Sequence, residues 1–403
     1  MKKQHLLFIT QYFYPENFKG NDIAFDLVQR GVDVTVITGI PNYPSGKFYK
    51  GYGLFKKTRE TINGVHIIRI PLVPRGSNSI MLMLNYFSFA FFASIFTFFH
   101  CLLHKYDSCF IQQLSPITIA LPGIIFKKLT HKPLSCWVLD LWPESLQSAG
   151  GVHNKMVLSF FDYIASMMYR NSDNILISSR GFEDFIAKKG DFKYKISYFP
   201  NWADHVLNHA FECNLPAMPV GFRVMFAGNI GEAQDFNHLV EAAKLLSLED
   251  EIKLIIIGDG RKKMWVDEQI VKYKLENVMY MFGRYPIESM PAFFRMADVM
   301  LVSLKNEIIF NLTAPAKIQA YMSVEKPIVA MMNGEGAAIV RDAQCGIIVP
   351  AESPIALVEA LKQIKNLTAK ERTILGINGR NYCETHFDKD RCLTNLYNLL
   401  FCK

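Results

Sequence analysis

The residues best suited to binding an anion lie where a loop runs into a predicted helix, at Leu312–Met322. Pro315 suits the first helical position, because proline lacks the N–H group that would be unpaired there. Lys317 then falls in the first turn, where the helix dipole already places positive charge. An anion held between the free N–H groups and the lysine ammonium would remove this conflict. An exposed, solvated lysine is the alternative, and this stretch alone does not decide between the two.

Glycine turns follow several predicted strands in the second half of the chain. A glycine there lets backbone N–H groups approach a phosphate, although it also serves an ordinary strand-to-helix turn. With the basic residues nearby, the set favours a diphosphate ligand. A dinucleotide oxidoreductase is disfavoured, because neither half carries GxGxxG after its first strand, and no Walker A loop, metal-binding motif or nucleophile elbow is recognisable. The turns are Gly228-Asn229-Ile230-Gly231, Gly258-Asp259-Gly260-Arg261-Lys262-Lys263, Gly283-Arg284 and Asn333-Gly334-Glu335-Gly336.

Two carboxylates in the first half follow a predicted strand at Leu134–Leu139. Asp140 and Glu144, with Trp142 between them, would lie at the edge of an open α/β sheet where ligands usually bind. Asp140 could instead cap a helix, with Trp142 as a packing residue. Gly20, just before another predicted helix, could admit a ligand close to the backbone, although a plain turn explains it equally.

The elements that must position these residues alternate between strand and helix along both halves, which predicts two doubly wound parallel sheets. A chain of 403 residues is also too long for one ordinary core. We expect a first domain at 1–200, a linker at 201–220, a second domain at 221–385 and a C-terminal helix within 386–403 that packs back on the first domain. The predicted strands are Leu6–Thr10, Val32–Thr38, Val65–Ile70, Asp107–Gln112, Leu134–Leu139, Asn174–Ile177, Ile196–Phe199, Arg223–Ala227, Lys253–Ile257, Val278–Phe282, Val299–Ser303, Ile328–Met331 and Gly346–Val349.

The composition is that of a globular protein, with 50% hydrophobic and 20% charged residues. A net charge of +7 favours an anionic ligand or an acidic membrane surface, and is too diffuse for nucleic-acid binding. Eight cysteines without a CxxC pair indicate neither a zinc site nor a disulfide framework. No signal peptide is recognisable, so we expect a cytoplasmic protein. The apolar segment Ile80–Leu103 is long enough to span a bilayer, but its interspersed polar residues favour a helix packed on a sheet with one face near lipid.

With these motifs in place, the second half resembles the donor domain of the family 4 glycosyltransferases of GT-B fold. The first half resembles the surface-polysaccharide branch of that family, and the whole resembles the WbuB-type transferases that add N-acetyl-L-fucosamine in O-antigen assembly. The stretches that carry the resemblance are Phe226–Gly231 through Gln234, Ile257–Gly260, Ala297–Val299, Pro315–Met322, Gly334–Ala337, Tyr14–Glu16, Pro41–Gly46, Asp140–Glu144 and Pro200–Asp204.

The resemblance implies two Rossmann-like domains facing an interdomain cleft, with a nucleotide-sugar donor bound there without a metal or cofactor. Lys317 would bind the diphosphate, and Asp140, with Glu144 as a second candidate, would face the donor sugar and the acceptor hydroxyl. The further residues that would contact the donor are Gly20, Gly228, Asn229, Gln234, Gly258, Arg261, Lys263, Arg284, Gln319 and Glu335.

One departure from the family pattern concerns its Glu-x7-Glu pair, which falls here on Leu312 and Ala320. Neither side chain can replace a carboxylate. Gln319 could hydrogen-bond a ribose hydroxyl, and Glu307 could stand in for the first acid.

We therefore expect a metal-independent transferase that moves an acetamido sugar from UDP to a polyprenyl-diphosphate-linked sugar. It would work as a peripheral protein at the cytoplasmic face of the inner membrane. A UDP-sugar 2-epimerase of the same fold is one alternative. A non-catalytic membrane-associated scaffold is another, given Leu312 and Ala320.

Overall fold

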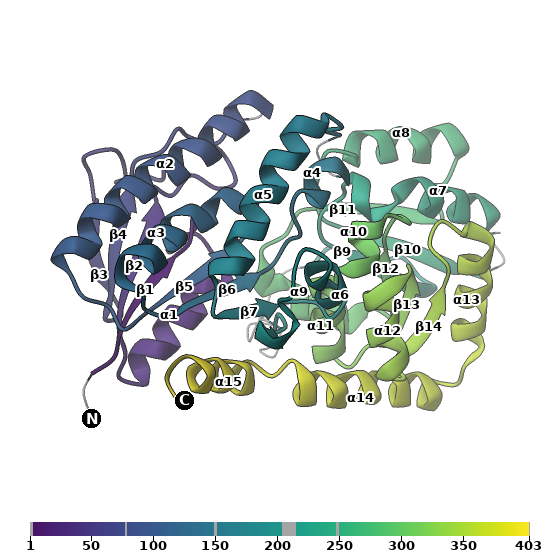
Figure 1. The fold of residues 1–403 in the computed structure, drawn as a ribbon. Helices are drawn as coiled ribbons and strands as arrows, with labels where there is room; N and C mark the ends of the chain where they lie inside the picture. Colours follow the sequence, from purple (N-terminus) through teal and green to yellow (C-terminus); the bar gives the residue numbers. More distant parts are fainter. Residues whose placement is uncertain (1–2, 77–78, 149–150, 204–214, 247–249, 403) are drawn as a thin grey trace. The chain divides into compact units, whose positions relative to one another are not determined.

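The computed structural model describes residues 3–76, 79–148, 151–203, 215–246 and 250–402 (Figure 1). Contacts within the chain divide it into two compact units, one of 1–200 with 392–403 and the other of 201–391. Most of the predicted linker at 201–220 falls in residues 204–214, which lie outside the described residues. Each unit is built on one sheet.

The first unit contains an eight-stranded sheet with the order β3-β4-β2-β1-β5-β6-β7-β8. All neighbours run parallel except β3 and β4. Helices α2, α3 and α5 lie along one face and α1 with α15 along the other (Figure 1). The strands are β1 His5–Ile9, β2 Asp33–Gly39, β3 Arg59–Ile62, β4 Val65–Ile70, β5 Ser108–Gln113, β6 Leu134–Val138, β7 Asn174–Ile177 and β8 Ile196–Tyr198, and the helices are α1 Lys19–Gln29, α2 Ser79–Leu103, α3 Ala120–Thr130, α4 Glu144–Ser148, α5 Lys155–Asn171, α6 Phe182–Ala187 and α15 Lys389–Phe401.

Strand β3 is missing from the sequence-based prediction, although the sequence carries a signal for it. Its last residue, Ile62, pairs with Val65, so the turn between them is the dipeptide Asn63-Gly64. Both turn residues have positive φ, 48° and 82°. Asn-Gly is the preferred dipeptide for such two-residue hairpins, because both positions require left-handed backbone.

Helix α15 packs on the first unit. Its Leu393 and Leu396 are buried. Arg30 at the end of α1 donates a hydrogen bond of 3.0 Å to Thr394 Oγ1, and its guanidinium lies 5.7 Å from the centre of the Tyr397 ring.

Helix α2 has one buried face and one exposed apolar face. Asn85, Phe89, Ala93 and Thr97, each four residues apart, are buried against the unit. Among the described residues, Ile80–Leu103 is the one helix long and apolar enough to cross a membrane, and 22% of its most apolar stretch is buried. The large exposed hydrophobic side chains of α2 are Ile80, Met83, Leu84, Phe87, Phe91, Phe92, Ile95, Phe98, Phe99, Leu102 and Leu103.

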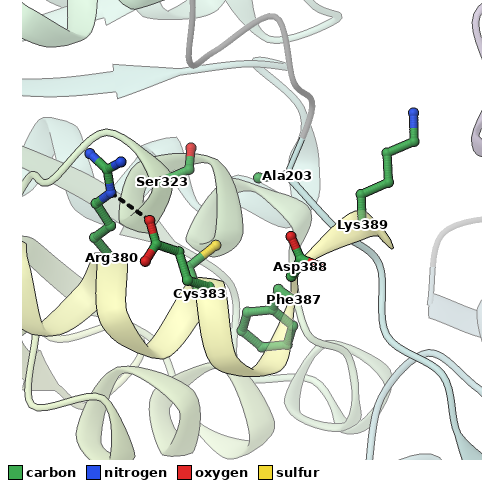
Figure 2. Close-up of a pocket in the computed structure, with 8 residues that line it drawn as sticks. Ala203, Ser323, Arg380, Cys383, Phe387, Asp388 and Lys389 are labelled. Carbon is green, nitrogen blue, oxygen red and sulfur yellow. Dashed lines mark hydrogen bonds and ion pairs between the residues drawn. The ribbon is translucent and has the colours of Figure 1, made fainter. Parts of the chain in front are cut away.

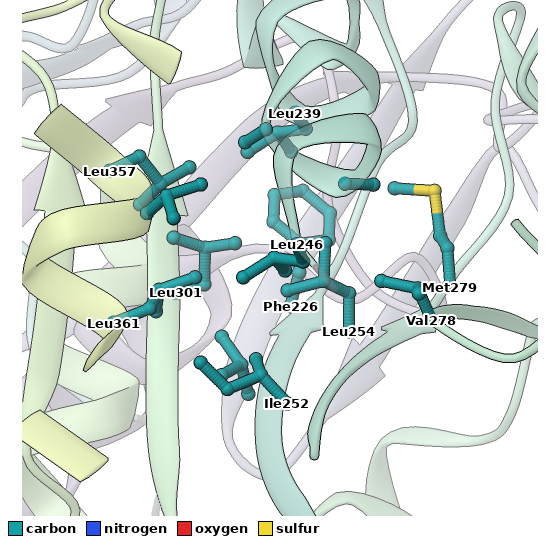
Figure 3. Packing of buried hydrophobic residues seen from close by; sticks show 14 of the residues in the cluster. Phe226, Leu239, Leu246, Ile252, Leu254, Val278, Met279, Leu301, Leu357 and Leu361 are labelled. Carbon is teal, nitrogen blue, oxygen red and sulfur yellow. The ribbon is translucent and has the colours of Figure 1, made fainter. Parts of the chain in front are cut away.

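The second unit contains a six-stranded, wholly parallel sheet with the order β11-β10-β9-β12-β13-β14. Its main core lies between this sheet and helices α7, α8 and α13 (Figure 3). The strands are β9 Phe222–Ala227, β10 Ile252–Ile257, β11 Met279–Gly283, β12 Val299–Ser303, β13 Ile328–Met331 and β14 Gly346–Val349, and the helices are α7 Phe236–Leu245, α8 Lys263–Tyr273, α9 Met290–Met296, α10 Ile308–Leu312, α11 Ala316–Ser323, α12 Gly334–Asp342, α13 Pro354–Asn366 and α14 Ala369–His386.

All thirteen predicted strands are confirmed, each within one residue at either end. Strand, glycine turn and helix repeat as the pattern predicts, so the doubly wound class is confirmed for both sheets, with antiparallel β3 as an added edge strand.

Candidate functional site

The second sheet reverses its strand order between β9 and β12, because β10 lies on one side of β9 and β12 on the other. Open α/β sheets bind ligands beyond the carboxyl ends of the strands at such a switch point. The ladder between these two strands consists of Val224 with Val299 and Met225 with Met300. Both strands continue further, to Ala227 and Ser303, so they diverge towards their carboxyl ends.

Two glycines follow the strands on one side of this point. Gly228 and Gly258 have φ of +136° and +147°. Gly228 N donates to Ile257 O at 2.8 Å, and Gly258 N donates to Gly283 O at 2.8 Å, which continues the ladder past the strands. A β-carbon added at Gly228 would lie 2.6 Å from Lys317 Cε, and one at Gly258 would collide with the Gly228 carbonyl. Only glycine therefore fits at these two positions.

Lys317, in the first turn of α11, has a buried ammonium group. Its Nζ lies 3.4 Å from the centre of the Phe226 ring and has no hydrogen-bond partner in the described structure. Burial lowers the pKa of Lys317 to about 7. The structure thus excludes the solvated alternative for this lysine. A buried, unpaired ammonium is costly, and an anion brought beside it would supply the missing partner.

The first turn of α12 lies against the first turn of α11. A β-carbon at Gly336 would lie 3.0 Å from Pro315 Cδ, so the small residue allows the two helices to approach. Both helix N-termini therefore lie near Lys317, and their unpaired N–H groups favour an anion. Glu335 is half-buried in the same turn of α12.

The remaining predicted residues of the second unit fall into two groups. Asn229 and Gln234 hold the glycine turn, because Gln234 Oε1 accepts from Asn229 Nδ2 at 3.3 Å and from Gly231 N at 3.1 Å. Lys263 forms a surface ion pair with Asp267 at 2.8 Å. Arg261 and Arg284 are exposed.

Gln319 lies elsewhere than predicted. It is 1% exposed, and when its amide is oriented so that oxygen and nitrogen both find partners, the nitrogen donates to Pro315 O at 3.0 Å and Ala316 O at 3.2 Å. The residue sits on the inner face of α11, three positions before buried Met322. It therefore braces the start of the helix from a buried position, which does not suit the ribose contact predicted above.

A cluster of charges beside the glycine turn was missed by sequence reasoning. Glu232 accepts from Lys262 at 3.1 Å and also pairs with Lys305. Lys262 falls in a basic run that the sequence shows. No sequence pattern marks Lys305, because its contact with Glu232 arises only when β12, which precedes Lys305, lies beside β9, which precedes Glu232.

Asp140 in the first unit lies just past β6, as predicted. Both its oxygens accept hydrogen bonds from serine hydroxyls, Oδ2 from Ser115 and Oδ1 from Ser145, and Trp142 Nε1 donates to Ser115 Oγ at 3.2 Å. Burial raises the pKa of Asp140, and these hydrogen bonds oppose the rise. Asp140 is thus held in one orientation and is more basic than a free aspartate.

Glu144 lies one turn further on, at the start of α4. Its Oε1 lies 3.4 Å from Lys189 Nζ, whereas Oε2 is buried without a partner in the described structure. Burial raises the pKa of Glu144 as well.

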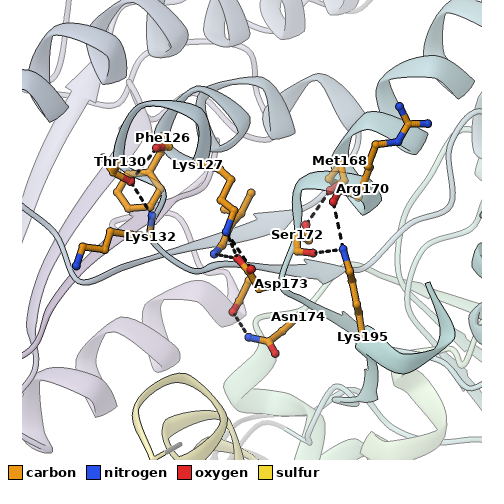
Figure 4. Close-up of polar contacts among 12 residues, drawn as sticks. Phe126, Lys127, Thr130, Lys132, Met168, Arg170, Ser172, Asp173, Asn174 and Lys195 are labelled. Carbon is orange, nitrogen blue, oxygen red and sulfur yellow. Dashed lines mark hydrogen bonds and ion pairs between the residues drawn. The ribbon is translucent and has the colours of Figure 1, made fainter. Parts of the chain in front are cut away.

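The strands that carry Asp140 are fixed at their opposite ends by charged side chains (Figure 4). Asp173 accepts from Lys127 Nζ at 2.9 and 2.8 Å and from Leu134 N at 2.7 Å, which joins α3, β6 and the start of β7. Lys195 Nζ donates to Arg170 O at 3.1 Å and to Ser172 O at 2.9 Å, and so caps the end of α5.

Gly20 serves packing rather than ligand access in this structure. It is buried in α1, and a side chain there would collide with Gln112 and Phe8. The space beside its backbone is occupied by the Gln112 amide, which accepts from Thr10 Oγ1 at 3.1 Å.

Two further residues at this sheet edge were given no role from the sequence. Glu16 is 2% exposed and accepts from Asn42 N at 2.8 Å and Tyr43 N at 2.6 Å, and burial raises its pKa to about 7. Arg75 Nη1 lies 3.1 Å from Tyr12 OH. Glu16 belongs to a motif noted above, whereas nothing in the sequence marks Arg75.

A small pocket elsewhere in the second unit lies beside α14 (Figure 2). Arg380 in its wall is already paired with Glu325 at 2.7 Å and Glu384 at 2.8 Å. The pocket contains none of the predicted site residues and is a poor anion site, since its guanidinium is neutralised. Its lining residues are Ala203, Ser323, Arg380, Cys383, Glu384, Phe387, Asp388 and Lys389.

Comparisons with known proteins agree with this geometry. Residues 221–382 match the family described as glycosyl transferases group 1. Over 399 residues the chain is 24% identical to WcaI of Escherichia coli K12, whose name assigns it to colanic acid biosynthesis as a glycosyl transferase, and the match covers 92% of each chain.

Two solved structures share the fold. Sucrose-phosphate synthase of Thermosynechococcus elongatus superposes with a TM-score of 0.74 at 16% identity, covering 99% of this chain and 100% of the other. HepE of Anabaena, solved with UDP and glucose, superposes with a TM-score of 0.68 at 14% identity, covering 99% of this chain and 100% of the other. The chain is therefore a glycosyltransferase of GT-B fold, with a group 1 glycosyl transferase domain at 221–382.

Proposed function

We propose that this transferase moves an acetamido sugar, N-acetyl-L-fucosamine, from UDP to a polyprenyl-diphosphate-linked sugar during surface-polysaccharide assembly. The observation that carries the proposal is the buried ammonium of Lys317 at the switch point of the second sheet, which has no hydrogen-bond partner among the described residues. The name of WcaI supports a role in polysaccharide synthesis, and the UDP bound to HepE supports a UDP donor. The choice of sugar rests on the resemblance of motifs given above.

The leaving UDP would be stabilised by the protein alone. Its diphosphate would lie between Lys317 and the first turns of α11 and α12, where N–H groups and the ammonium replace the charge that a metal ion supplies in other transferases. The first unit would contribute Asp140. Its raised pKa suits a group that accepts the proton of an acceptor hydroxyl, and Ser115 and Ser145 hold it in one orientation.

The acceptor would be reached at the cytoplasmic face of the inner membrane, with α2 lying on the lipid. Its exposed face is aliphatic and aromatic over the whole length, and Ile80–Leu103 contains no Asp, Glu, Lys or Arg. Because the other face packs on the unit, the helix would lie in the interface rather than cross the bilayer. The net charge of +7 would add attraction to acidic lipids.

Calorimetric titration of the detergent-purified protein with UDP, with and without EDTA, tests the donor site. We expect binding in both conditions and loss of affinity in Lys317→Met. Lys326→Met is the matched control, because Lys326 is also a partly buried lysine but lies at the amino-terminal ends of the strands, where it donates to Arg295 O and Ala297 O. Absence of UDP binding would overturn the proposal, and binding abolished by EDTA would overturn its metal-free form.

Incubation with radiolabelled UDP-sugars and a synthetic polyprenyl-diphosphate acceptor then tests the reaction. Label should appear in the lipid product, with UDP-N-acetyl-L-fucosamine as the preferred donor. A 2-epimerised UDP-sugar formed without lipid would indicate the epimerase instead.

Flotation with vesicles of phosphatidylethanolamine and phosphatidylglycerol tests the membrane contact. The double substitution Phe91→Glu and Phe98→Glu on α2 should weaken binding by about tenfold or more, because each removes a large apolar side chain from the lipid face. Ile374→Glu with Ile377→Glu, on exposed residues of α14, is the control and should have little effect. Equal flotation of both variants would exclude α2 as the lipid-binding face.

A further inference from the structure

Tyr321 joins α11 to the last residue of β9 by two hydrogen bonds. Its hydroxyl donates to Ala227 O at 3.1 Å and accepts from Ala227 N at 2.9 Å. The side chain is 1% exposed, and its ring packs edge-on against Phe294 with the ring centres 5.5 Å apart.

The hydroxyl occupies a place that the sheet leaves open. β10 pairs with β9 along its whole length to Ala227, whereas β12 pairs with β9 only as far as Met225. Gly228 N turns to the β10 side, where it donates to Ile257 O. Ala227, one residue earlier, therefore turns its N–H and C=O to the β12 side, where no strand is close enough to pair. Buried backbone groups need partners, and one hydroxyl supplies both.

The same contact fixes the anion site. Lys317 precedes Tyr321 by four residues, so both side chains lie on one face of α11. The Lys317 ammonium lies over the Phe226 ring and its Cε lies beside Gly228, the residues on either side of Ala227. The two hydrogen bonds at Ala227 therefore hold the glycine turn and the lysine at a set separation.

We propose that Tyr321 is a positioning residue for the donor diphosphate, and that its hydroxyl holds the Gly228 backbone and Lys317 in register for that ligand. This inference rests on the proposed function, because it takes the ligand at Lys317 to be the diphosphate of a UDP-sugar. A hydroxyl that only stabilised the fold would affect folding without affecting donor binding selectively.

The test compares Tyr321→Phe with Lys326→Met in the full-length protein. Tyr321→Phe keeps the ring against Phe294 and removes only the oxygen. Lys326→Met also removes two hydrogen bonds to backbone carbonyls, at the amino-terminal ends of the strands of the same sheet. Four quantities are measured: the melting temperature, the amide hydrogen exchange of the peptide spanning 226–230 without ligand, the dissociation constant for UDP by calorimetry, and the Michaelis constant for the lipid acceptor.

We expect Tyr321→Phe to speed exchange in that peptide and to weaken UDP binding by about tenfold. The Michaelis constant for the lipid acceptor should stay unchanged. Lys326→Met should lower the melting temperature without either local effect. UDP binding by Tyr321→Phe within about twofold of the unmodified protein, or unchanged exchange in the peptide, would overturn the positioning role alone. Absence of UDP binding by the unmodified protein would overturn the proposed function, and the positioning role with it.

Discussion

Binding of UDP should draw a proton onto Lys317. Burial lowers the pKa of this lysine to about 7 in the free protein, from an ordinary value of 10.5. At pH 8 only about a tenth of the molecules then carry the ammonium, whereas at pH 6 about nine-tenths do. A diphosphate beside Nζ favours the charged form and raises the pKa again. We therefore expect uptake of nearly one proton per UDP at pH 8, and much less as the pH is lowered below 7.

Calorimetry in buffers of equal pH and different ionisation enthalpy measures this uptake directly, as the slope of the observed enthalpy. The affinity for UDP should also fall as pH rises above 7, by about tenfold per unit until the pKa of the complex is reached. Lys317→Met should abolish the uptake. Lys326→Met is the control, since burial lowers the pKa of Lys326 too, yet its ammonium is already bound to Arg295 O and Ala297 O. No uptake at pH 8 by the unmodified protein, or full uptake by Lys317→Met, would refute the reasoning.

Four further outcomes follow from the same geometry. Lys317→Ala should reduce turnover by about a hundredfold or more, measured with labelled donor, because one charged contact to the leaving diphosphate is lost. Burial lowers the pKa of Lys317 to about 7 in the folded protein, so Lys317→Met should raise the free energy of unfolding in urea most at pH 7 and below, and this gain should vanish towards pH 10. Burial raises the pKa of Glu16 to about 7, so the free energy of unfolding gained by Glu16→Gln should grow between pH 4.5 and 7 and persist above pH 7. The reverse pH trend in either variant would contradict the assigned burial. Asp140→Asn should lower kcat by about a hundredfold and leave UDP affinity unchanged, because the amide keeps the size of the side chain and one acceptor oxygen for a serine hydroxyl but cannot take a proton. Ala320→Glu, three residues from Lys317 on α11, should raise the lysine pKa and reduce the proton uptake on UDP binding at pH 8.

The strands of both sheets could be predicted because the sequence pattern that marks a buried strand is local. Each buried strand is a short apolar run bounded by glycine or polar residues, and this pattern needs no knowledge of distant contacts. Asn63-Gly64 shows that even the missed hairpin was within reach of the same reasoning. The position of Lys317 in a helical first turn was predictable too, since Pro315 marks the start of that helix.

The state of Lys317 could not be predicted, because it depends on contacts between remote segments. Its burial arises from the divergence of β9 and β12 and from the Phe226 ring below it. The interpretation of Gln319 failed for a related reason. The residue was considered because it is next to Ala320, where the family pattern has an acid, whereas helix geometry turns it inward, three positions before buried Met322. Gly20 was likewise considered without Gln112, which the fold brings against it.

The alanine at 320 helps to explain why the Lys317 ammonium has no hydrogen-bond partner among the described residues. A glutamate at 320 would be a neighbour of Lys317 on α11, and it would keep that ammonium charged in the free protein. With alanine there, the Lys317 ammonium lies over the Phe226 ring without a hydrogen-bond partner among the described residues, and burial lowers its pKa. On the proposed function, the donor diphosphate would bring a full negative charge to the lysine. On the proposed function, alanine at 320 would therefore make the charge of this site depend on its ligand, and we expect donor binding to be coupled to protonation.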